Sequence, residues 1–183
     1  MKKVILLITV IVSLLGFKGF SQSFPDPEIS ERPYILGSDS SLKNFERPDA
    51  LYMQRVKGFG GYGGNEKYYE VASPKSEIVF SKNAIPKIII KVTGNIDVTE
   101  QLFLCKGEVK KKRRVFVTIA HSFVNQKKDI SNSNIKLEFR KIKDGIFEII
   151  LPNNIESGEY AFLPLFSMEN INAQKKISCF GIN

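Results

Sequence analysis

The stretch that decides the fold reads IESGEYAF and covers residues 155–162. It combines a glycine-containing turn with a tyrosine, and an apolar residue follows the tyrosine by two positions. In immunoglobulin-like sandwiches, a tyrosine at the start of the sixth strand donates a hydrogen bond back across the turn, and the position two residues later points into the core. We therefore expect Tyr160 to form such a corner and Phe162 to lie in the core. An ordinary strand that begins with a tyrosine is the alternative.

Short runs rich in Val, Ile, Phe and Tyr surround this stretch, and turn residues recur about every ten positions, as in an antiparallel sandwich. Within residues 87–93, three aliphatic side chains face one way and two lysines face the other, which predicts one face on the core and one in water. The pair Asp144-Gly145 between two runs predicts a hairpin. We expect strands at 77–81, 87–93, 101–106, 114–121, 135–142, 145–151, 159–165 and 177–182.

The sequence before residue 74 predicts an extended arm and a hairpin. Residues 22–46 contain three prolines and a serine-rich patch, which indicates an extended arm with one short strand at 34–36. Strands expected at 50–57 and 67–72, joined by a glycine-rich stretch, predict a hairpin. The fold class that follows is all-β: an immunoglobulin-like antiparallel β-sandwich over residues 74–183, extended by an N-terminal arm and β-hairpin region over residues 22–73.

Residues 1–21 have the three-part layout of a secretory signal peptide. Two lysines open the chain, an almost unbroken apolar run covers residues 4–15, and the small residues Gly19 and Ser21 precede the expected cleavage point. The apolar run is too short for a membrane span of about 20 residues, although a retained N-terminal anchor is the alternative. We expect an exported protein without a membrane span, located in the periplasm, at the cell surface or outside the cell.

The charge balance and the cysteines narrow the possibilities further. The chain has 27 Lys and Arg residues against 19 Asp and Glu, and the signal segment holds three of the basic ones, so 24 remain and the net charge becomes +5. This moderate excess permits contact with anionic surfaces without requiring it. The export route tolerates disulfides, and whether Cys105 and Cys179 pair depends on the separation of their Cα atoms.

Five features extend along most of the mature chain, roughly from Pro27 to the end. They are the glycine-rich stretch before Tyr68-Tyr69, PKS at 74–76, the basic run at 110–114, SGEYAF at 157–162 and CFGIN at 179–183. In these features the chain resembles a family of uncharacterised exported proteins of Bacteroidetes-type bacteria. Its members tend to end in Phe-Gly-Ile-Asp, so the final asparagine here departs from the pattern. The resemblance implies the fold and the exported location, and no activity.

Residues 58–63 satisfy the pattern G-x-G-x-x-G of dinucleotide-binding proteins. That pattern needs a helix directly after it, so that the helix N-terminus meets the pyrophosphate. Here the following residues indicate a strand, and we expect no nucleotide site. The same region is rich in tyrosine, and Phe59, Tyr62, Tyr68 and Tyr69 could form an aromatic surface for protein or glycan contact. In the alternative, these rings pack onto the sandwich and the glycines allow a tight turn.

The basic run at 110–114 joins two expected strands. Lys111 and Arg113 are its candidate binding residues, because adjacent cations can hold phosphate or lipid headgroups. The alternative is a solvated turn that protects a sheet edge from aggregation. We expect no nucleic-acid partner, since the chain lacks further basic stripes with exposed aromatic residues.

No catalytic set is evident in the sequence. His121 is the single histidine, and we expect it at the rim of the core. No nucleophile-elbow, zincin or Cys-x-x-Cys motif is present, and one histidine with two distant cysteines does not suit zinc. We therefore expect no catalytic residues, no metal and no cofactor. A glycosidase needs only two well-placed carboxylates, so that alternative stays open.

The leading hypothesis is a non-enzymatic interaction module that binds an unknown protein or envelope polymer. It would use the Gly-Tyr hairpin and the basic turn. The alternative is a hydrolase that acts on envelope glycans or peptides through carboxylates. A third hypothesis is an assembly role for the proline-rich arm, if that arm is free to add to the sheet edge of a neighbouring molecule.

Overall fold

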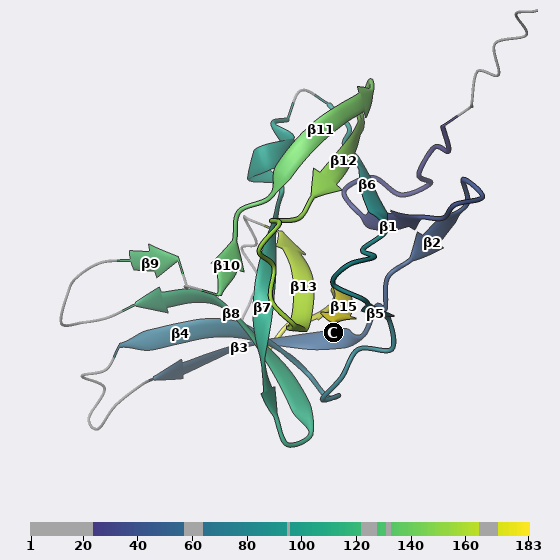
Figure 1. The fold of residues 1–183 in the computed structure, drawn as a ribbon. Helices are drawn as coiled ribbons and strands as arrows, with labels where there is room; N and C mark the ends of the chain where they lie inside the picture. Colours follow the sequence, from purple (N-terminus) through teal and green to yellow (C-terminus); the bar gives the residue numbers. More distant parts are fainter. Residues whose placement is uncertain (1–23, 57–63, 95, 122–127, 131–132, 165–171) are drawn as a thin grey trace, which may run out of the picture.

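The computed structural model describes residues 24–56, 64–94, 96–121, 128–130, 133–164 and 172–183; for 120–121 and 128–130 it describes the backbone only. This part of the chain is all-β and forms two sheets (Figure 1). One short 3-10 helix, η2 (Val98–Glu100), precedes the longest strands. Among the described residues, no helix is long and apolar enough to cross a membrane. The expected all-β, sandwich-like fold is confirmed.

The first sheet has five strands, all paired antiparallel, in the order β11-β12-β6-β1-β2. The expected Asp-Gly hairpin joins its strands β11 and β12. Gly145 at this turn has a φ of 72°, which disfavours a side chain. The strands are β1 (Pro33–Leu36), β2 (Leu42–Asn44), β6 (Lys87–Lys91), β11 (Glu138–Lys143) and β12 (Ile146–Ile150).

The second sheet follows the order β14-β3-β4-β8-β7-β13-β15-β5, with β9 beside β8 and β10 beside β7. Only the β15–β5 pair is parallel among the pairs of the described residues. Its strands are β3 (Asp49–Val56), β4 (Asn65–Val71), β5 (Val79–Phe80), β7 (Leu102–Lys110), β8 (Arg113–His121), β9 (Lys128–Ile130), β10 (Asn134–Ile135), β13 (Gly158–Pro164), β14 (Gln174–Lys176) and β15 (Ser178–Ile182).

The second sheet curls and is nearly closed by one segment of the chain. β14 is one end strand and pairs with β3, whereas the adjoining β15 lies between β13 and the other end strand, β5. A bridge between Glu46 and Cys179 closes the remaining gap. Both sheets contain strands from before and after residue 73: β1 and β2 lie in the first sheet, whereas β3 and β4 form the expected hairpin in the second.

Two large apolar clusters and a small one around Tyr68, Val115 and Val117 follow from this arrangement. The first lies between the sheets, with Ile88 and Ile90 from β6 against Phe162 and Phe180. The second lies inside the curl of the large sheet and contains Tyr69, Phe116 and Leu163, among others. Burial of each large apolar side chain contributes about 1.5–3 kcal/mol, so these clusters are the main source of stability.

The tyrosine corner forms as expected. The hydroxyl of Tyr160 donates a hydrogen bond to the carbonyl oxygen of Glu156 at 2.7 Å. Phe162 lies in the inter-sheet cluster and its ring packs edge-on against Phe45, with ring centroids 5.4 Å apart. The sequence stretch that suggested the fold therefore sits where the turn meets the core.

The centre of β6 differs from the expectation that one of its faces is solvated. Ile89, on the same face as the two lysines of the strand, is 0% exposed. The reason is the N-terminal arm: Lys91 on that face forms an ion pair with Asp26 at 3.0 Å, and Pro27 is buried. The described part of the arm, from residue 24 onward, thus packs on its own domain. The sequence analysis also missed β2, β9 and β14, which are three-residue strands of largely polar composition.

Candidate functional site

The two described residues of the expected aromatic surface, Tyr68 and Tyr69, are buried. Phe59 and Tyr62 lie outside the described residues. Tyr69 is 1% exposed and its ring centroid lies 4.9 Å from that of Tyr52 inside the curled sheet. Tyr68 is also buried, with the guanidinium of Arg55 5.2 Å from its ring centroid. The positions of Tyr68 and Tyr69 favour the alternative, in which the rings pack within the sheet.

The five cations of the basic run have different surroundings. Lys111 is exposed at the turn between β7 and β8. Arg113 donates hydrogen bonds from Nη1 to both carboxylate oxygens of Glu70, at 3.0 and 2.8 Å. Lys110 forms an ion pair with Glu108 at 3.2 Å. Two of the surface cations are therefore neutralised by neighbouring glutamates, which favours the solvated turn over a phosphate-binding cluster.

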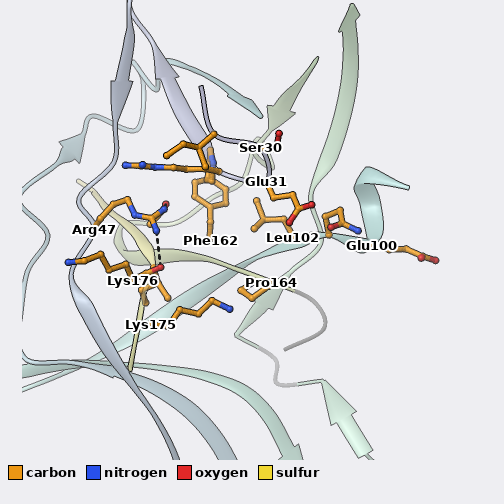
Figure 2. A pocket seen from close by; sticks show the side chains of 15 residues that line it. Ser30, Glu31, Arg47, Glu100, Leu102, Phe162, Pro164, Lys175 and Lys176 are labelled. Atoms are coloured by element: carbon orange, nitrogen blue, oxygen red, sulfur yellow. Dashed lines mark hydrogen bonds between the residues drawn. The ribbon is translucent and has the colours of Figure 1, made fainter. Parts of the chain in front are cut away.

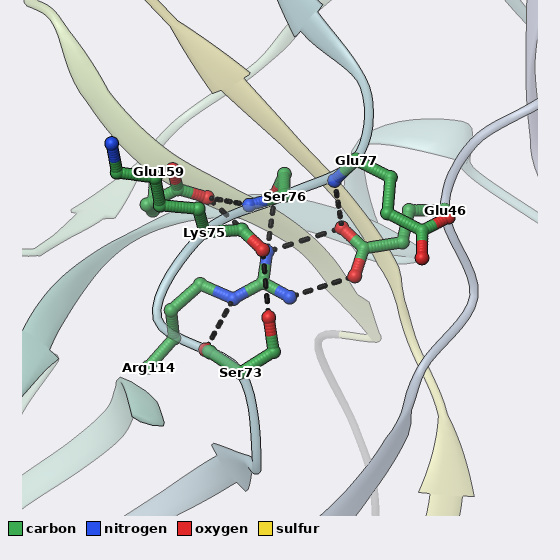
Figure 3. A network of polar contacts seen from close by, with 7 residues as sticks. All are labelled: Glu46, Ser73, Lys75, Ser76, Glu77, Arg114 and Glu159. Carbon is green, nitrogen blue, oxygen red and sulfur yellow. Dashed lines mark hydrogen bonds and ion pairs between the residues drawn. The ribbon is translucent and has the colours of Figure 1, made fainter. Parts of the chain in front are cut away.

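Arg114, the last residue of the run, is 0% exposed. Figure 3 shows its guanidinium surrounded by acceptors from other segments. Nη2 lies 2.8 Å from Glu46 Oε1, Nη1 lies 3.2 Å from Glu159 Oε2, and Nε donates to the carbonyl oxygen of Ser73 at 3.1 Å. Nη1 also donates to the hydroxyl of Ser76. Burial alone would lower the pKa of Arg114, but its hydrogen bond and ion pair with Glu46 raise the pKa above its usual value.

The sequence analysis correctly expected a strand from Arg114 onward, but it interpreted the basic run as either an anion-binding or a solvated turn, and the burial of Arg114 fits neither interpretation. Successive residues of β8 face opposite sides of the sheet, so Arg114 lies on the same side as the buried Phe116. Its partners lie 68 and 45 positions away in the sequence, at Glu46 and Glu159. The network therefore ties together the segment before β3, the loop after β4, β8 and β13. All of its charges are paired, so it is a structural element rather than a binding site.

The open question of the disulfide is settled by the strand register. Both Cys105 and Cys179 lie opposite Ala161, one on each side of β13. Adjacent strands are about 4.8 Å apart, so the two Cα atoms are separated by roughly 10 Å, beyond the limit of about 7 Å for a disulfide. Both cysteines are free and buried. Burial raises the pKa of Cys105 to about 12, which leaves the thiol unreactive near neutral pH.

A cleft of about 440 Å³ lies beneath the N-terminal arm (Figure 2). The arm forms one wall, and η2 with the start of β7, the end of β13, and β14 form the others. Phe162, Leu102 and Pro164 provide apolar surface within it. We call this cavity the arm cleft. It is lined by Ile29, Ser30, Glu31, Arg32, Pro33, Arg47, Glu100, Gln101, Leu102, Phe162, Pro164, Lys175, Lys176, Ile177 and Ser178.

Two arginines of the arm cleft lack a carboxylate partner among the described residues. The guanidinium of Arg32 lies 5.4 Å from the ring centroid of Tyr34, and its Nε is buried without a hydrogen-bond partner in the described part of the chain. Arg47 donates to Ser178 Oγ at 3.3 Å and to the carbonyl oxygen of Lys176 at 3.1 Å. Burial, and then repulsion from the nearby Arg32, lower the pKa of Arg47.

The charges of the arm cleft are separated in space. Figure 2 shows Arg47, Lys175 and Lys176 on one side and Glu100 at the other. Glu31, also in the wall, has a φ of 62°, in the left-handed region that a non-glycine residue seldom adopts. Such strained residues cluster at ligand sites, where the surrounding structure maintains them. None of the arm-cleft residues was a candidate in the sequence analysis, because their elements are far apart in the chain.

The remaining expectations concern metals and catalysis. Among the described residues, no group of three His, Cys, Asp or Glu side chains is arranged to hold a metal ion. His121 ends β8, and its side chain lies outside the described part. The sequence matches no protein family model and no curated protein, and the structure matches no solved structure. The arm cleft is therefore the candidate functional site of the described residues.

Proposed function

We propose that this protein is an exported, non-enzymatic interaction module that binds part of an envelope polymer in the arm cleft. The observation that carries the proposal is the cleft itself, which combines apolar surface with two arginines that no described carboxylate neutralises. Its volume of about 440 Å³ falls within the range of about 300–1,000 Å³ that is usual for ligand sites. An envelope protein is the other partner class that the sequence analysis left open.

Two further parts of the proposal, the export and the type of sandwich, rest on observations outside the cleft. The signal-peptide layout of residues 1–21 supports export. The hydrogen bond of Tyr160 to Glu156 supports an immunoglobulin-like sandwich, because such a corner is a feature of those domains. The likeness to exported proteins of Bacteroidetes-type bacteria is consistent with both.

A bulky substitution in the wall of the arm cleft tests the proposal. Gln101→Trp places a large ring at a half-buried wall position, and Gln54→Trp makes the same change at an exposed position of β3, outside the cleft. The immobilised variants are incubated with an envelope extract, and the retained carbohydrate is measured. We expect Gln101→Trp to retain little and Gln54→Trp to match the unchanged protein. Equal retention by all three proteins would remove the arm cleft from consideration.

The hydrolase alternative is favoured by one observation, the presence of Glu31 and Glu100 in the same cleft. A pair of carboxylates can act as general acid and as base or nucleophile. Release of soluble sugar or peptide from the envelope extract, abolished by Glu31→Gln or Glu100→Gln, would establish it. Binding without release supports the interaction module instead.

A further inference from the structure

We propose that the arm cleft recognises the carboxylate of an acidic sugar, and that Arg32 and Arg47 hold this group together. The inference rests on the proposed function of the cleft and names the chemistry of its ligand. Uronic acid residues are a class of sugars that carry such a carboxylate on the ring.

The arginines of the chain differ in whether a glutamate neutralises them. The chain contains six arginines, all within the described residues. Four form an ion pair with a glutamate, whereas Arg32 and Arg47, which both line the arm cleft, have no such pair among the described residues. Because glutamates neutralise the other four, the lack of a described carboxylate partner marks these two as available for an external anion. The four paired arginines are Arg55, Arg113, Arg114 and Arg140.

The two guanidinium groups are held by different contacts, and both have donors left for a ligand. Arg47 is fixed by Ser178 and by the carbonyl oxygen of Lys176, which leaves donors of the same guanidinium for a ligand. The buried Nε of Arg32 has no acceptor in the described part of the chain, and an unsatisfied charged donor is unfavourable. A carboxylate oxygen would supply that acceptor. Arginine is also the side chain best suited to planar oxyanions, because its donors form a rigid fork.

The other residues that line the cleft favour a sugar carboxylate over a more highly charged group. Glu31 and Glu100 line the same cleft, so a second negative charge on the ligand would meet repulsion. Ser30 and Gln101 offer partners for hydroxyl groups, whereas Phe162 and Leu102 provide apolar surface. A sugar ring has polar edges and an apolar face of C–H groups, and a uronic acid adds one negative charge. This combination matches the cleft better than a phosphate does.

Arginine Nε–H resonances provide a direct test. The purified protein, labelled with ¹⁵N, is titrated at constant ionic strength with sodium glucuronate, glucose, sodium acetate and inorganic phosphate. We expect saturable shifts of the Arg32 and Arg47 signals with glucuronate, weaker binding of acetate and phosphate, and no shift with glucose. Arg32→Gln and Arg47→Gln should each raise the dissociation constant for glucuronate at least tenfold, because each removes charge-assisted hydrogen bonds. Arg140→Gln, a matched change on the exposed β11, should leave the constant within twofold.

Several results would overturn the inference. Equal shifts with glucose would show that the carboxylate is not recognised, and equal or tighter binding of phosphate would show a general anion site. If Arg47→Gln does not fold, Arg32→Gln decides, because the buried Nε of Arg32 has no hydrogen-bond partner within the described residues. If the arginine variants still retain envelope polymer while Gln101→Trp does not, the proposed function stands and the carboxylate inference fails. If none of these variants affects retention, both fail.

Discussion

Replacement of Arg114 by methionine is the sharpest test of how this fold is held together. The change removes the only cation of the buried network but keeps a side chain of similar length. Glu46 and Glu159 would then stay in their buried positions, with side chains 9% and 12% exposed, and would lose the guanidinium that compensates their charge. Four chain segments would lose their common tether.

The expected magnitude follows from the burial of the pair. Breaking a buried ion pair by removal of one partner costs about 3–5 kcal/mol, because the remaining charge is uncompensated. A domain of this kind has a free energy of unfolding of about 5–15 kcal/mol, so the loss is a large fraction of the total. For a chain of this size each kcal/mol corresponds to about 2–4 °C in Tm, so we expect Tm to fall by about 6–20 °C.

Urea unfolding followed by far-ultraviolet circular dichroism measures this loss, and the neighbouring arginine provides the control. Arg113 also binds a glutamate, but its side chain is 51% exposed, and exposed ion pairs contribute about 0–1 kcal/mol. We therefore expect Arg113→Met to shift the urea midpoint little. Two adjacent arginines in one basic run would then differ several-fold in their effect on stability.

A charge-neutral variant separates the two causes of the loss. In the triple variant Arg114→Met, Glu46→Gln and Glu159→Gln, the network no longer contains a charge, and we expect part of the lost stability to return. If the triple variant is as unstable as Arg114→Met alone, uncompensated charge is not the cause. If Arg114→Met costs less than about 1 kcal/mol, the whole account of the network is refuted, since this is the range of a surface pair.

Two further predictions concern the corner and the thiols. Tyr160→Phe removes the hydrogen bond to Glu156 and should lower the free energy of unfolding by about 0.5–1.5 kcal/mol in urea titrations; an unchanged midpoint would deny the corner a stabilising role. Because burial raises the pKa of Cys105 from 9.0 to about 12, the unfolded chain releases the thiol proton first, so stability is complete below pH 9 and falls as the pH rises toward 12. At pH 10 this loss is about 1.4 kcal/mol and should be absent in Cys105→Ala, so parallel pH profiles of the two proteins would contradict it.

The parts of the fold that could be predicted from sequence are those with a strong local signal. The IESGEYAF stretch places the corner correctly because its turn and tyrosine lie within a few residues. Most strands with alternating or continuous apolar residues occur close to their expected ranges, for example β12 and β15. The order of these strands along the chain does not predict which strands pair with each other in a sheet. The closure of the large sheet by the segment from β14 to β15 depends on pairing between distant residues, which periodicity does not contain.

Local sequence signals were a poorer guide to the candidate site than to the strands. The glycine-rich and basic stretches attracted attention because they are unusual over five or six residues, yet Tyr68, Tyr69 and Arg114 are buried. The arm cleft is assembled from single residues of the arm, η2, β7, β13 and β14, none of which is unusual locally. No local sequence signal marks Arg32 and Arg47, because each directly follows a glutamate in the chain. Only the spatial arrangement shows that neither arginine has a carboxylate partner among the described residues.

The contrast between Arg114 and the pair in the arm cleft indicates how structural and ligand-binding cations differ in this molecule. Burial of Arg114 would be prohibitive without compensation, and the fold supplies two glutamates and two serine oxygens from distant segments. Arg32 and Arg47 lie close enough to repel one another, yet the fold places no described carboxylate against either. The fold pairs its fully buried arginine with two glutamates, whereas the two partly buried arginines of the arm cleft have no carboxylate partner among the described residues. These two guanidinium groups without a described counter-charge are the physical reason for proposing that an anion binds in the arm cleft.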